Sequence, residues 1–291
     1  MATTGKILVT GATGNTGPGL VSALCAAGAD VRVLVRDEAK ARPLQAMGAE
    51  VVVGDLDRPE TLGPAIAGVA KVYLLTWNGP TQAQQVHDFI RATKRVGAPH
   101  IVRHSMWGSP RSRIIQQGEQ AEAEIASSGL PWTLLKPTFF MQNTMMAART
   151  IANDGVIYWD LKDGRLGMID VRDIIDVAVA VLTGDGHEGQ NYILTGPAAI
   201  SFHDVAATFS AVLGREITYV PVPGEAALQS MTGMGFPEWV SRGFIELSEG
   251  FSEGFASQVT GDVATLTGHP ARSFEQFVSD FADVFRRAAV A

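Results

Sequence analysis

A glycine-rich turn near the start of the chain constrains the fold more than any other feature. The run Gly11-Ala12-Thr13-Gly14-Asn15-Thr16-Gly17 follows the apolar residues 7–9 and precedes a helical pattern over 18–27. A strand that turns through glycines into a helix is typical of dinucleotide pyrophosphate sites in α/β proteins. The glycines allow a tight turn, backbone approach to phosphate and close helix packing, and the helix N-terminus attracts anions. We therefore expect this turn, through Gly11, Thr13, Gly14, Asn15, Thr16 and Gly17, to bind a dinucleotide.

The composition is that of a folded chain without a nucleic-acid or membrane partner. Hydrophobic residues make up 46% of the 291 residues and charged residues 18%, which excludes an intrinsically disordered protein. A net charge of −7 and scattered arginines argue against a nucleic-acid surface. No apolar stretch is long enough to span a bilayer, and no signal peptide is expected before the first strand. Because Cys25 is the one cysteine, we expect a cytoplasmic protein and a buried, structural thiol.

Strand-like and helix-like segments alternate through the first half of the chain. Strands are expected over 7–9, 31–35, 51–53, 71–76, 100–105 and 132–136, and helices over 37–47, 59–66, 82–96 and 117–127. Nearly continuous apolar strands, each followed by a helix, indicate a parallel sheet covered on both faces. The sequence therefore predicts an α/β fold with a doubly wound parallel sheet of the Rossmann type.

The second half is less regular and predicts a smaller, mixed C-terminal lobe. Helices are expected over 139–152, 171–182, 202–213 and 273–287, and short strands over 156–158 and 191–195. We predict a dinucleotide-binding domain over 1–153 and a substrate-binding lobe over 154–291, with 170–196 returning to the Rossmann sheet. Such a lobe is expected beside the carboxyl edge of the sheet, where open α/β folds bind ligands.

Four segments in order resemble one protein family. They are the glycine turn, Gly54-Asp55-Leu56, the stretch Ser128-Gly129-Leu130-Pro131-Trp132-Thr133-Leu134-Leu135-Lys136-Pro137, and Asp170-Val171-Arg172-Asp173-Ile174. Together they look like the NmrA-like atypical short-chain dehydrogenases, and in particular the triphenylmethane reductase and NAD(P)H:quinone oxidoreductase subgroup. The resemblance implies the fold and an NAD(P) cofactor but no particular substrate. The family also contains NAD(P)-sensing regulators without established turnover.

The end of the second strand decides which dinucleotide is expected. An acidic side chain there binds the ribose 2′-hydroxyl of NAD, whereas an arginine accommodates the 2′-phosphate of NADP. Arg36 is the first polar residue after the strand, and a guanidinium pairs bidentately with phosphate. Asp37 is interpreted as the N-cap of the next helix. We predict NADP(H), with a solvated surface arginine as the alternative role for Arg36.

Further cofactor contacts follow from the ends of the other strands. The resemblance places Asp55 and Leu56 against the adenine, although Asp55 is equally suited to capping the next helix. The ribose and pyrophosphate are expected beside Thr76, Trp77 and Asn78. By the same resemblance, the nicotinamide is bordered by Pro137, Thr138 and Phe139, and Ser105 is also expected near it.

The expected catalytic pair is missing from the chain. Ordinary short-chain dehydrogenases carry Tyr-x-x-x-Lys on the helix after the fifth strand, where the tyrosine is the general acid. The corresponding segment 116–124 contains neither residue, and Glu119 and Glu122 are expected on a solvated helix face. The candidates that remain are Ser105 and His104, which strand alternation points to opposite faces of the sheet. Lys136 is interpreted as structural, and no metal is expected.

Loss of that pair favours acceptors that need no proton donor in the site. Quinones, dyes, imines and enones delocalise the charge that arrives with hydride, whereas a simple ketone develops an alkoxide. We therefore predict an NADPH-dependent reductase of a planar conjugated acceptor. Its expected aromatic or polar lining comprises Trp77, Trp107, Phe139, Phe140, Met141, Asn143, Tyr158, Trp159, Met234, Phe236 and Trp239, of which about half are expected to be core residues.

Two other functions remain open at this point. One is an NADP(H)-binding redox sensor that acts through a protein partner, and the other is a biosynthetic ketoreductase that uses Ser105. The expected partner of the enzyme is a small aromatic or conjugated substrate, and the chain is expected to be a monomer or homodimer.

Overall fold

The structure, a computed structural model, describes residues 5–286 and divides the chain into two units. Unit 1 comprises the chain up to Met106 together with Gln117–Lys136 and Ile174–Ile193. Unit 2 comprises Trp107–Gln116, Pro137–Asp173 and the chain from Leu194 onward. Each unit is built from segments that are distant in sequence, so the chain passes between them several times.

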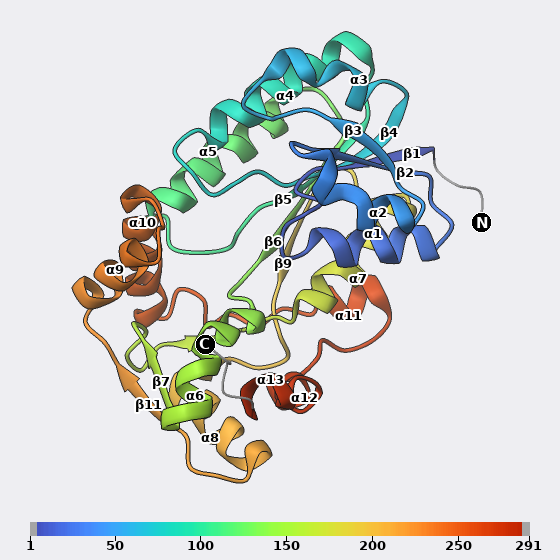
Figure 1. Cartoon of the computed structure of the whole chain (residues 1–291). Helices are drawn as coiled ribbons and strands as arrows, with labels where there is room; N and C mark the ends of the chain where they lie inside the picture. The colour runs from blue at the N-terminus through green and yellow to red at the C-terminus, as the bar shows by residue number, and fades with distance from the viewer. Residues whose placement is uncertain (1–4, 287–291) are drawn as a thin grey trace. The chain divides into compact units, whose positions relative to one another are not determined.

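Unit 1 is built around a seven-stranded sheet in the order β3-β2-β1-β4-β5-β6-β9 (Figure 1). The strands are β1 (Lys6–Val9), β2 (Val31–Val35), β3 (Glu50–Val53), β4 (Val69–Leu74), β5 (His100–His104), β6 (Trp132–Pro137) and β9 (Gln190–Leu194). The pairs from β3 to β6 are parallel. The order reverses between β1 and β4, where open α/β sheets bind ligands. The predicted fold class is confirmed.

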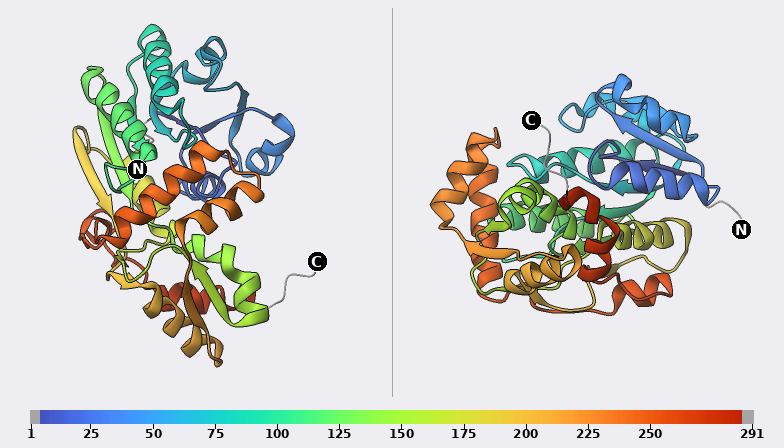
Figure 2. Two further views of the ribbon diagram at one scale, coloured as in Figure 1. Left: turned by 90° about the vertical axis from the view of Figure 1, so that its left-hand side faces the viewer. Right: turned by 60° about the horizontal axis from the view of Figure 1, so that its bottom comes forward.

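Helices cover both faces of this sheet. They are α1 (Gly17–Ala26), α2 (Arg42–Ala46), α3 (Gly63–Ile66), α4 (Gln82–Val96), α5 (Arg113–Ser127) and α7 (Val171–Thr183). Helices α4 and α5 lie side by side, teal and green in Figures 1 and 2. On the other face, a Cβ at Gly19 of α1 would lie 2.6 Å from Ile175 Cδ1, so α1 packs tightly on α7.

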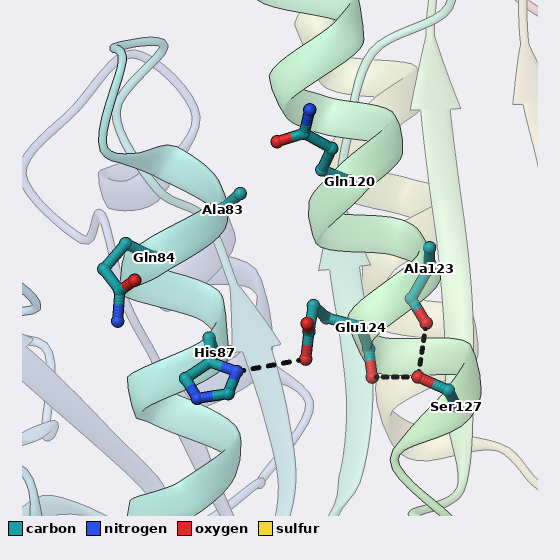
Figure 3. A pocket seen from close by; sticks show the side chains of 7 residues that line it. All are labelled: Ala83, Gln84, His87, Gln120, Ala123, Glu124 and Ser127. Carbon is teal, nitrogen blue, oxygen red and sulfur yellow. Dashed lines mark hydrogen bonds and ion pairs between the residues drawn. The ribbon is translucent and has the colours of Figure 1, made fainter.

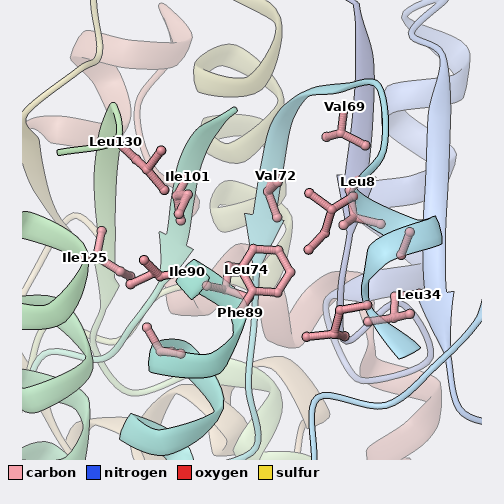
Figure 4. Close-up of a cluster of buried hydrophobic side chains, with 14 of the residues drawn as sticks. Leu8, Leu34, Val69, Val72, Leu74, Phe89, Ile90, Ile101, Ile125 and Leu130 are labelled. Atoms are coloured by element: carbon pink, nitrogen blue, oxygen red, sulfur yellow. The ribbon is translucent and has the colours of Figure 1, made fainter. Parts of the chain in front are cut away.

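The core under α3, α4 and α5 is apolar and closed to water. Phe89 lies at its centre, and alternate strand residues such as Leu8 and Val72 point into it (Figure 4). Its buried members are Leu8, Leu34, Leu62, Ala65, Ile66, Val69, Val72, Leu74, Val86, Phe89, Ile90, Ile101, Ala121, Ile125 and Leu130. Burial of such side chains contributes about 1.5–3 kcal/mol each, which holds the strand ends in fixed positions.

Unit 2 contains two small sheets and most of the later helices. Its strands are β7 (Val156–Trp159), β8 (Arg165–Leu166), β10 (Ile200–Ser201) and β11 (Thr218–Pro221); β11 pairs with β7 and β10 with β8. Its helices are α6 (Ala148–Asp154), α8 (Phe202–Leu213), α9 (Gly224–Gly233), α10 (Glu238–Ser252), α11 (Asp262–Thr267), α12 (Phe274–Asp280) and α13 (Ala282–Arg286). Asp170 and Arg172 form an ion pair, so the segment 170–174, one of the four that resemble the family, has a structural role.

Several expected elements differ from those in the structure. The helix over 139–152 is wrong in its first half, because Met141–Ala147 forms a 3-10 helix (η3) before α6. The helix over 37–47 is a 3-10 turn, Glu38–Ala41 (η1), followed by α2, whose Pro43 lacks the N–H that would continue an earlier helix. The segment over 59–66 divides similarly into Pro59–Thr61 (η2) and α3. The helix over 273–287 breaks at Phe281, and residue 287 lies outside the described residues.

Candidate functional site

The glycine turn connects β1 to α1 at the point where the strand order reverses. Gly11 has φ +64°, a left-handed conformation that favours glycine, and a Cβ there would lie 2.9 Å from Leu75 Cδ2. Thr10 Oγ1 donates to Leu75 O at 2.8 Å and accepts from Leu75 N at 2.8 Å, so the ends of β1 and β4 are tied together. A Cβ at Gly17 would lie 2.5 Å from Ala12 Cα. The turn therefore folds closely onto the first residue of α1.

The outward part of this turn is open to a ligand. Thr13, Gly14 and Asn15 are exposed, whereas Thr16 and Gly17 are buried. Thr16 is the N-cap of α1, and within the described part of the chain its side chain makes no capping hydrogen bond to this helix. Such a helix N-terminus behind a glycine turn fits a pyrophosphate, because its N–H groups and partial positive charge attract anions.

Arg36 lies just beyond the end of β2 and is exposed. Asp37 caps η1 by accepting a hydrogen bond from Ala39 N at 2.9 Å, so the predicted N-cap is confirmed. By contrast, Arg32 on the same strand donates to Ala65 O and Ala67 O and pairs with Glu50. Arg32 is therefore held by protein groups, whereas Arg36 is exposed at the end of this strand.

Asp55 and Leu56 follow β3 and are half-buried. The Asp55 carboxylate accepts a hydrogen bond from Asp57 N at 3.1 Å, which makes it the cap of a local turn. Asp57 in turn accepts a hydrogen bond from Gln85 of α4 at 2.7 Å. The segment that follows β3 is therefore held in position by hydrogen bonds within the protein.

The end of β4 combines a buried and an exposed part. Thr76 is buried, and its hydroxyl accepts a hydrogen bond from Arg103 at 2.8 Å. Arg103 itself is fully buried within β5, and burial lowers the pKa of its guanidinium to about 10. Trp77 is exposed, and Asn78 accepts a hydrogen bond from Gln82 at 3.2 Å. Of these three predicted contacts, Trp77 offers the largest accessible surface.

The two catalytic candidates point to opposite faces of the sheet, as strand alternation predicts. His104 Nδ1 is hydrogen-bonded to the hydroxyl of Tyr73 on β4, whereas Ser105 Oγ donates to Glu122 of α5. Burial, reinforced by the charge of Arg103, lowers the pKa of His104 to about 3. Its imidazole is therefore neutral at physiological pH and is not an imidazolium acid.

Glu122 differs from the expectation of a solvated helix face. Its carboxylate accepts a hydrogen bond from Ser105 at 2.5 Å and pairs with Lys136 of β6 at 2.8 Å. The side chains of Glu122 and Lys136 are only 12% and 9% exposed. The expectation fails because Glu122 shares the inner face of α5 with the buried residues Ala121 and Ile125. Glu119, in contrast, is exposed as predicted.

The predicted nicotinamide loop and part of the substrate lining lie together in unit 2. Pro137 and Thr138 are buried, and Thr138 N donates to Leu194 O at 3.0 Å. The ring of Phe139 contacts Trp159 and Phe202 edge to face, at centroid distances of 5.6 and 6.0 Å. Phe202 is fully buried, so these aromatic side chains form a packed cluster.

The other predicted lining residues of unit 2 are spread over several elements. Trp107 packs against Phe255 at 6.1 Å between ring centroids, and Trp239 lies under the guanidinium of Arg113 at 5.9 Å. Phe140 and Asn143 are half-buried at the start of η3, whereas Met141 is buried. Exposed positions are Tyr158, Met234 and Phe236.

A groove on unit 1 is lined by none of the predicted site residues. It has a volume of about 460 Å³ between α4 and α5. Its lining comprises Ala83, Gln84, His87, Gln120, Ala123, Glu124 and Ser127 (Figure 3). His87 of α4 points to Glu124 of α5, and the two are 3.2 Å apart. None of the lining residues ends a strand, so this groove does not coincide with the dinucleotide edge.

Neither a metal centre nor a membrane span is found in the described part of the chain. Residues 5–286 contain no cluster of three or more His, Cys, Asp or Glu side chains arranged for a metal ion. No helix in that range combines the length and apolar character needed to cross a bilayer. Cys25 is half-buried, and burial raises the pKa of its thiol.

Comparison with known proteins identifies the family. Residues 3–265 match the NmrA-like family. The chain is 40% identical to the NAD(P)H azoreductase of Xenophilus azovorans over 97% of this chain and 100% of that protein. Two solved structures are each 25% identical and covered over 99% of their length. One is an NADPH-dependent quinone oxidoreductase from Escherichia coli complexed with NADPH, with TM-score 0.86 over 95% of this chain. The other is the Citrobacter sp. triphenylmethane reductase complexed with NADP(H), with TM-score 0.84 over 94% of this chain. The chain belongs to the NmrA-like family, and the predicted resemblance is confirmed.

Proposed function

We propose that this chain is an NADPH-dependent reductase of small, planar, conjugated acceptors. That it is an oxidoreductase agrees with its similarity to an NAD(P)H azoreductase and an NADPH-dependent quinone oxidoreductase. The cofactor, when bound, supplies the hydride. We further propose which class of acceptor the protein reduces and which residues contact the acceptor.

The observation that carries this proposal is that the described residues around the end of β5 include no ordinary proton donor. Helix α5 has no Tyr-x-x-x-Lys pair. His104 is buried and hydrogen-bonded to Tyr73, and burial keeps its pKa far below neutrality. Ser105 donates its hydroxyl hydrogen to Glu122. A quinone or azo compound tolerates such a site, because it delocalises the incoming charge and then takes a proton from solvent, whereas a cationic dye accepts hydride on carbon and needs no proton.

The cofactor assignment rests on the glycine turn and Arg36. Unit 1 offers an uncapped helix N-terminus for the pyrophosphate and an exposed guanidinium beyond β2 for a 2′-phosphate. The predicted cofactor contacts at Asp55, Leu56, Thr76, Trp77, Asn78, Pro137, Thr138 and Phe139 are part of this proposal. We also propose that residues 154–291 supply substrate contacts, that the protein is a monomer or homodimer, and that it is cytoplasmic.

The relatives point to the same chemical class of acceptor. Their names refer to an azo compound, a quinone and a triphenylmethane dye, three acceptors that share an extended conjugated system. Aromatic pockets suit such molecules, because flat rings stack on aromatic side chains. We propose Trp77, Trp107, Phe139, Phe140, Asn143, Tyr158, Trp159, Met234 and Trp239 as the candidate substrate contacts.

A turnover panel tests this proposal. NADPH oxidation is followed at its absorbance maximum with a quinone, an azo dye, a triphenylmethane dye, an enone and a simple ketone. We expect turnover with conjugated acceptors and little with the ketone. Tight NADPH binding without any turnover would instead favour the redox sensor, which the missing Tyr–Lys pair also allows, and a pull-down with and without NADPH would then seek its partner. Preference for the ketone would favour the ketoreductase.

A further inference from the structure

The hydroxyl of Ser105 is hydrogen-bonded to a buried ion pair formed by Glu122 and Lys136. Glu122 of α5 accepts the Ser105 hydroxyl at 2.5 Å on one carboxylate oxygen and pairs with Lys136 of β6 at 2.8 Å on the other. Ser105 itself is 9% exposed. Three residues, one directly after β5, one on α5 and one on β6, thus form one chain of charge-assisted hydrogen bonds at the carboxyl end of the sheet. Such bonds are about twice as strong as neutral ones.

This arrangement fixes the direction in which Ser105 makes hydrogen bonds. A carboxylate that is paired with an ammonium carries no hydrogen, so it only accepts. The Ser105 hydrogen must therefore point to Glu122, and the lone pairs of Oγ remain for another partner. A Cβ at Gly118 would lie 3.4 Å from Gln82 Oε1 and 3.7 Å from Ser105 Oγ, so a side chain there would contact both oxygens, and glycine avoids this.

The position of Ser105 in the sheet indicates which ligand approaches it. In a sheet of this order, a dinucleotide lies across the strand reversal between β1 and β4. Arg36, on the β2 side of that reversal, is proposed to take the adenosine half. The nicotinamide half then belongs on the side of β4, β5 and β6, where Ser105 directly follows β5.

We propose that Glu122 and Lys136 hold Ser105 as a hydrogen-bond acceptor for a ligand N–H or O–H group at the end of β5. This inference rests on the proposed function, because it takes NADPH and a conjugated molecule as the ligands. The donor is the carboxamide N–H of the nicotinamide or an O–H group of the substrate or reduced product. In either case Ser105 is a ligand-contacting residue that orients its partner and does not protonate it. Glu122 and Lys136 are positioning residues.

A binding comparison tests the cofactor as the source of the donor. The probes are NADPH and its reduced 3-acetylpyridine analogue, in which a methyl ketone replaces the carboxamide and removes its N–H donors. Kd values are measured by fluorescence titration for the wild type and for Ser105→Ala. If the carboxamide donates to Ser105, the wild type binds the analogue about threefold to tenfold more weakly than NADPH, as expected for one hydrogen bond. In Ser105→Ala this preference shrinks toward unity.

A second comparison tests the substrate as the source. The probes are 2-naphthol, which has an O–H donor, and 2-methoxynaphthalene, which lacks it, each titrated onto enzyme loaded with NADP⁺. If the substrate donates, the wild type prefers 2-naphthol and Ser105→Ala does not. A preference that depends on Ser105 in either comparison supports the proposal and identifies the source. If Ser105→Ala changes neither ratio, Ser105 is not an acceptor and the proposal is wrong.

The role of Glu122 is tested with Glu122→Gln, and Glu119→Gln on the exposed face of the same helix is the matched control. With a glutamine, the amide oxygen turns to Lys136 and the NH₂ group to Ser105, so the hydroxyl hydrogen becomes free to donate and one of its two lone pairs is occupied. The preference for the N–H or O–H probe should then shrink, whereas Glu119→Gln keeps it. An unchanged preference in Glu122→Gln would overturn the positioning role. If Glu122→Gln does not fold because the buried Glu122–Lys136 ion pair is lost, the double variant Glu122→Gln/Lys136→Met replaces it.

Failure of this proposal can be distinguished from failure of the proposed function. If NADPH does not bind to the wild type at all, the proposed function is wrong. If NADPH binds and is oxidised but the probe ratios do not depend on Ser105, only the acceptor role is wrong.

Discussion

Gly14→Ala and Gly17→Ala should affect the stability of the protein differently, although both should weaken NADPH binding. At Gly17 the new Cβ would lie 2.5 Å from Ala12 Cα and still closer to the carbonyl carbon and oxygen of the same residue. Non-bonded carbons prefer about 3.5–4.0 Å, so the backbone of the turn must move by about 1 Å. At Gly14 the nearest atom is Gly11 O at 3.3 Å, which needs a shift of only a few tenths of an ångström.

The magnitudes follow from these distances. Overpacking of this kind costs about 1–3 kcal/mol, so Gly17→Ala should lower the free energy of unfolding by that amount. Gly14→Ala should change stability by less than about 0.5 kcal/mol, as most exposed substitutions do. Both should weaken NADPH binding by about tenfold or more, Gly17→Ala by displacing the turn and Gly14→Ala by blocking backbone approach to the pyrophosphate.

Urea unfolding followed by circular dichroism, together with fluorescence titration of NADPH, separates the two effects. Equal stability of the two variants would refute the packing role assigned to Gly17. Wild-type NADPH affinity in both would refute the assignment of the turn as the pyrophosphate site.

Three further perturbations follow from individual residues. Arg36→Ala should weaken NADPH binding by about 1.5–3 kcal/mol and leave NADH binding unchanged in parallel titrations, and equal losses would contradict the NADP assignment. The lowered pKa of His104 means that the unfolded chain takes up a proton between pH 6.5 and about 3 that the folded chain does not. The free energy of unfolding should therefore decrease as the pH is lowered through this window. His104→Gln should flatten the dependence of this free energy on pH by about 1.4 kcal/mol per pH unit. An unchanged slope in pH-dependent urea unfolding argues against a neutral His104. Phe89→Ala should cost about 3–5 kcal/mol in the same assay, because Phe89 is fully buried in the unit 1 core, and a loss below about 1 kcal/mol contradicts this packing.

The regular half of the fold was predictable because its signals are local. Most strands of the Rossmann sheet contain a short apolar run, as β1 and β2 do, and alternation along the segment after His100 correctly placed His104 and Ser105 on opposite faces. Asp37 caps η1 as its residue type and position indicate. Such features depend on residues that are close in sequence, so one amino-acid sequence is enough to predict them.

Features that depend on distant segments were missed. Helix α10 contains Gly243 and Gly250, which disfavour a helix by themselves. A Cβ at Gly243 would lie 2.6 Å from Ile114 Cγ1, so the glycine is needed for close packing against a segment about 130 residues earlier. No helix was predicted over this segment.

The site was predictable in part for the same reason. The segment 116–124 contains mostly polar residues and indicated a solvated face, yet Glu122 is enclosed with Lys136. Two signals could have found it: the helical spacing of Glu122 with the buried Gly118 and Ile125, and a lysine on a buried strand that requires a partner. Arg103 was missed because its partners, Leu74 O and Thr76, become neighbours only in the sheet.

Direct hydride transfer to a conjugated acceptor is tested most directly by a single-turnover experiment. Enzyme loaded with one equivalent of NADPH is mixed with a quinone or an azo dye, and the loss of NADPH absorbance is recorded with unlabelled cofactor and with cofactor deuterated at one face of C4. We predict that NADPH is consumed without added flavin or metal, and that deuterium on one face, but not on the other, slows the reaction. Bound NADPH that remains reduced in the presence of every conjugated acceptor would contradict the proposed reductase.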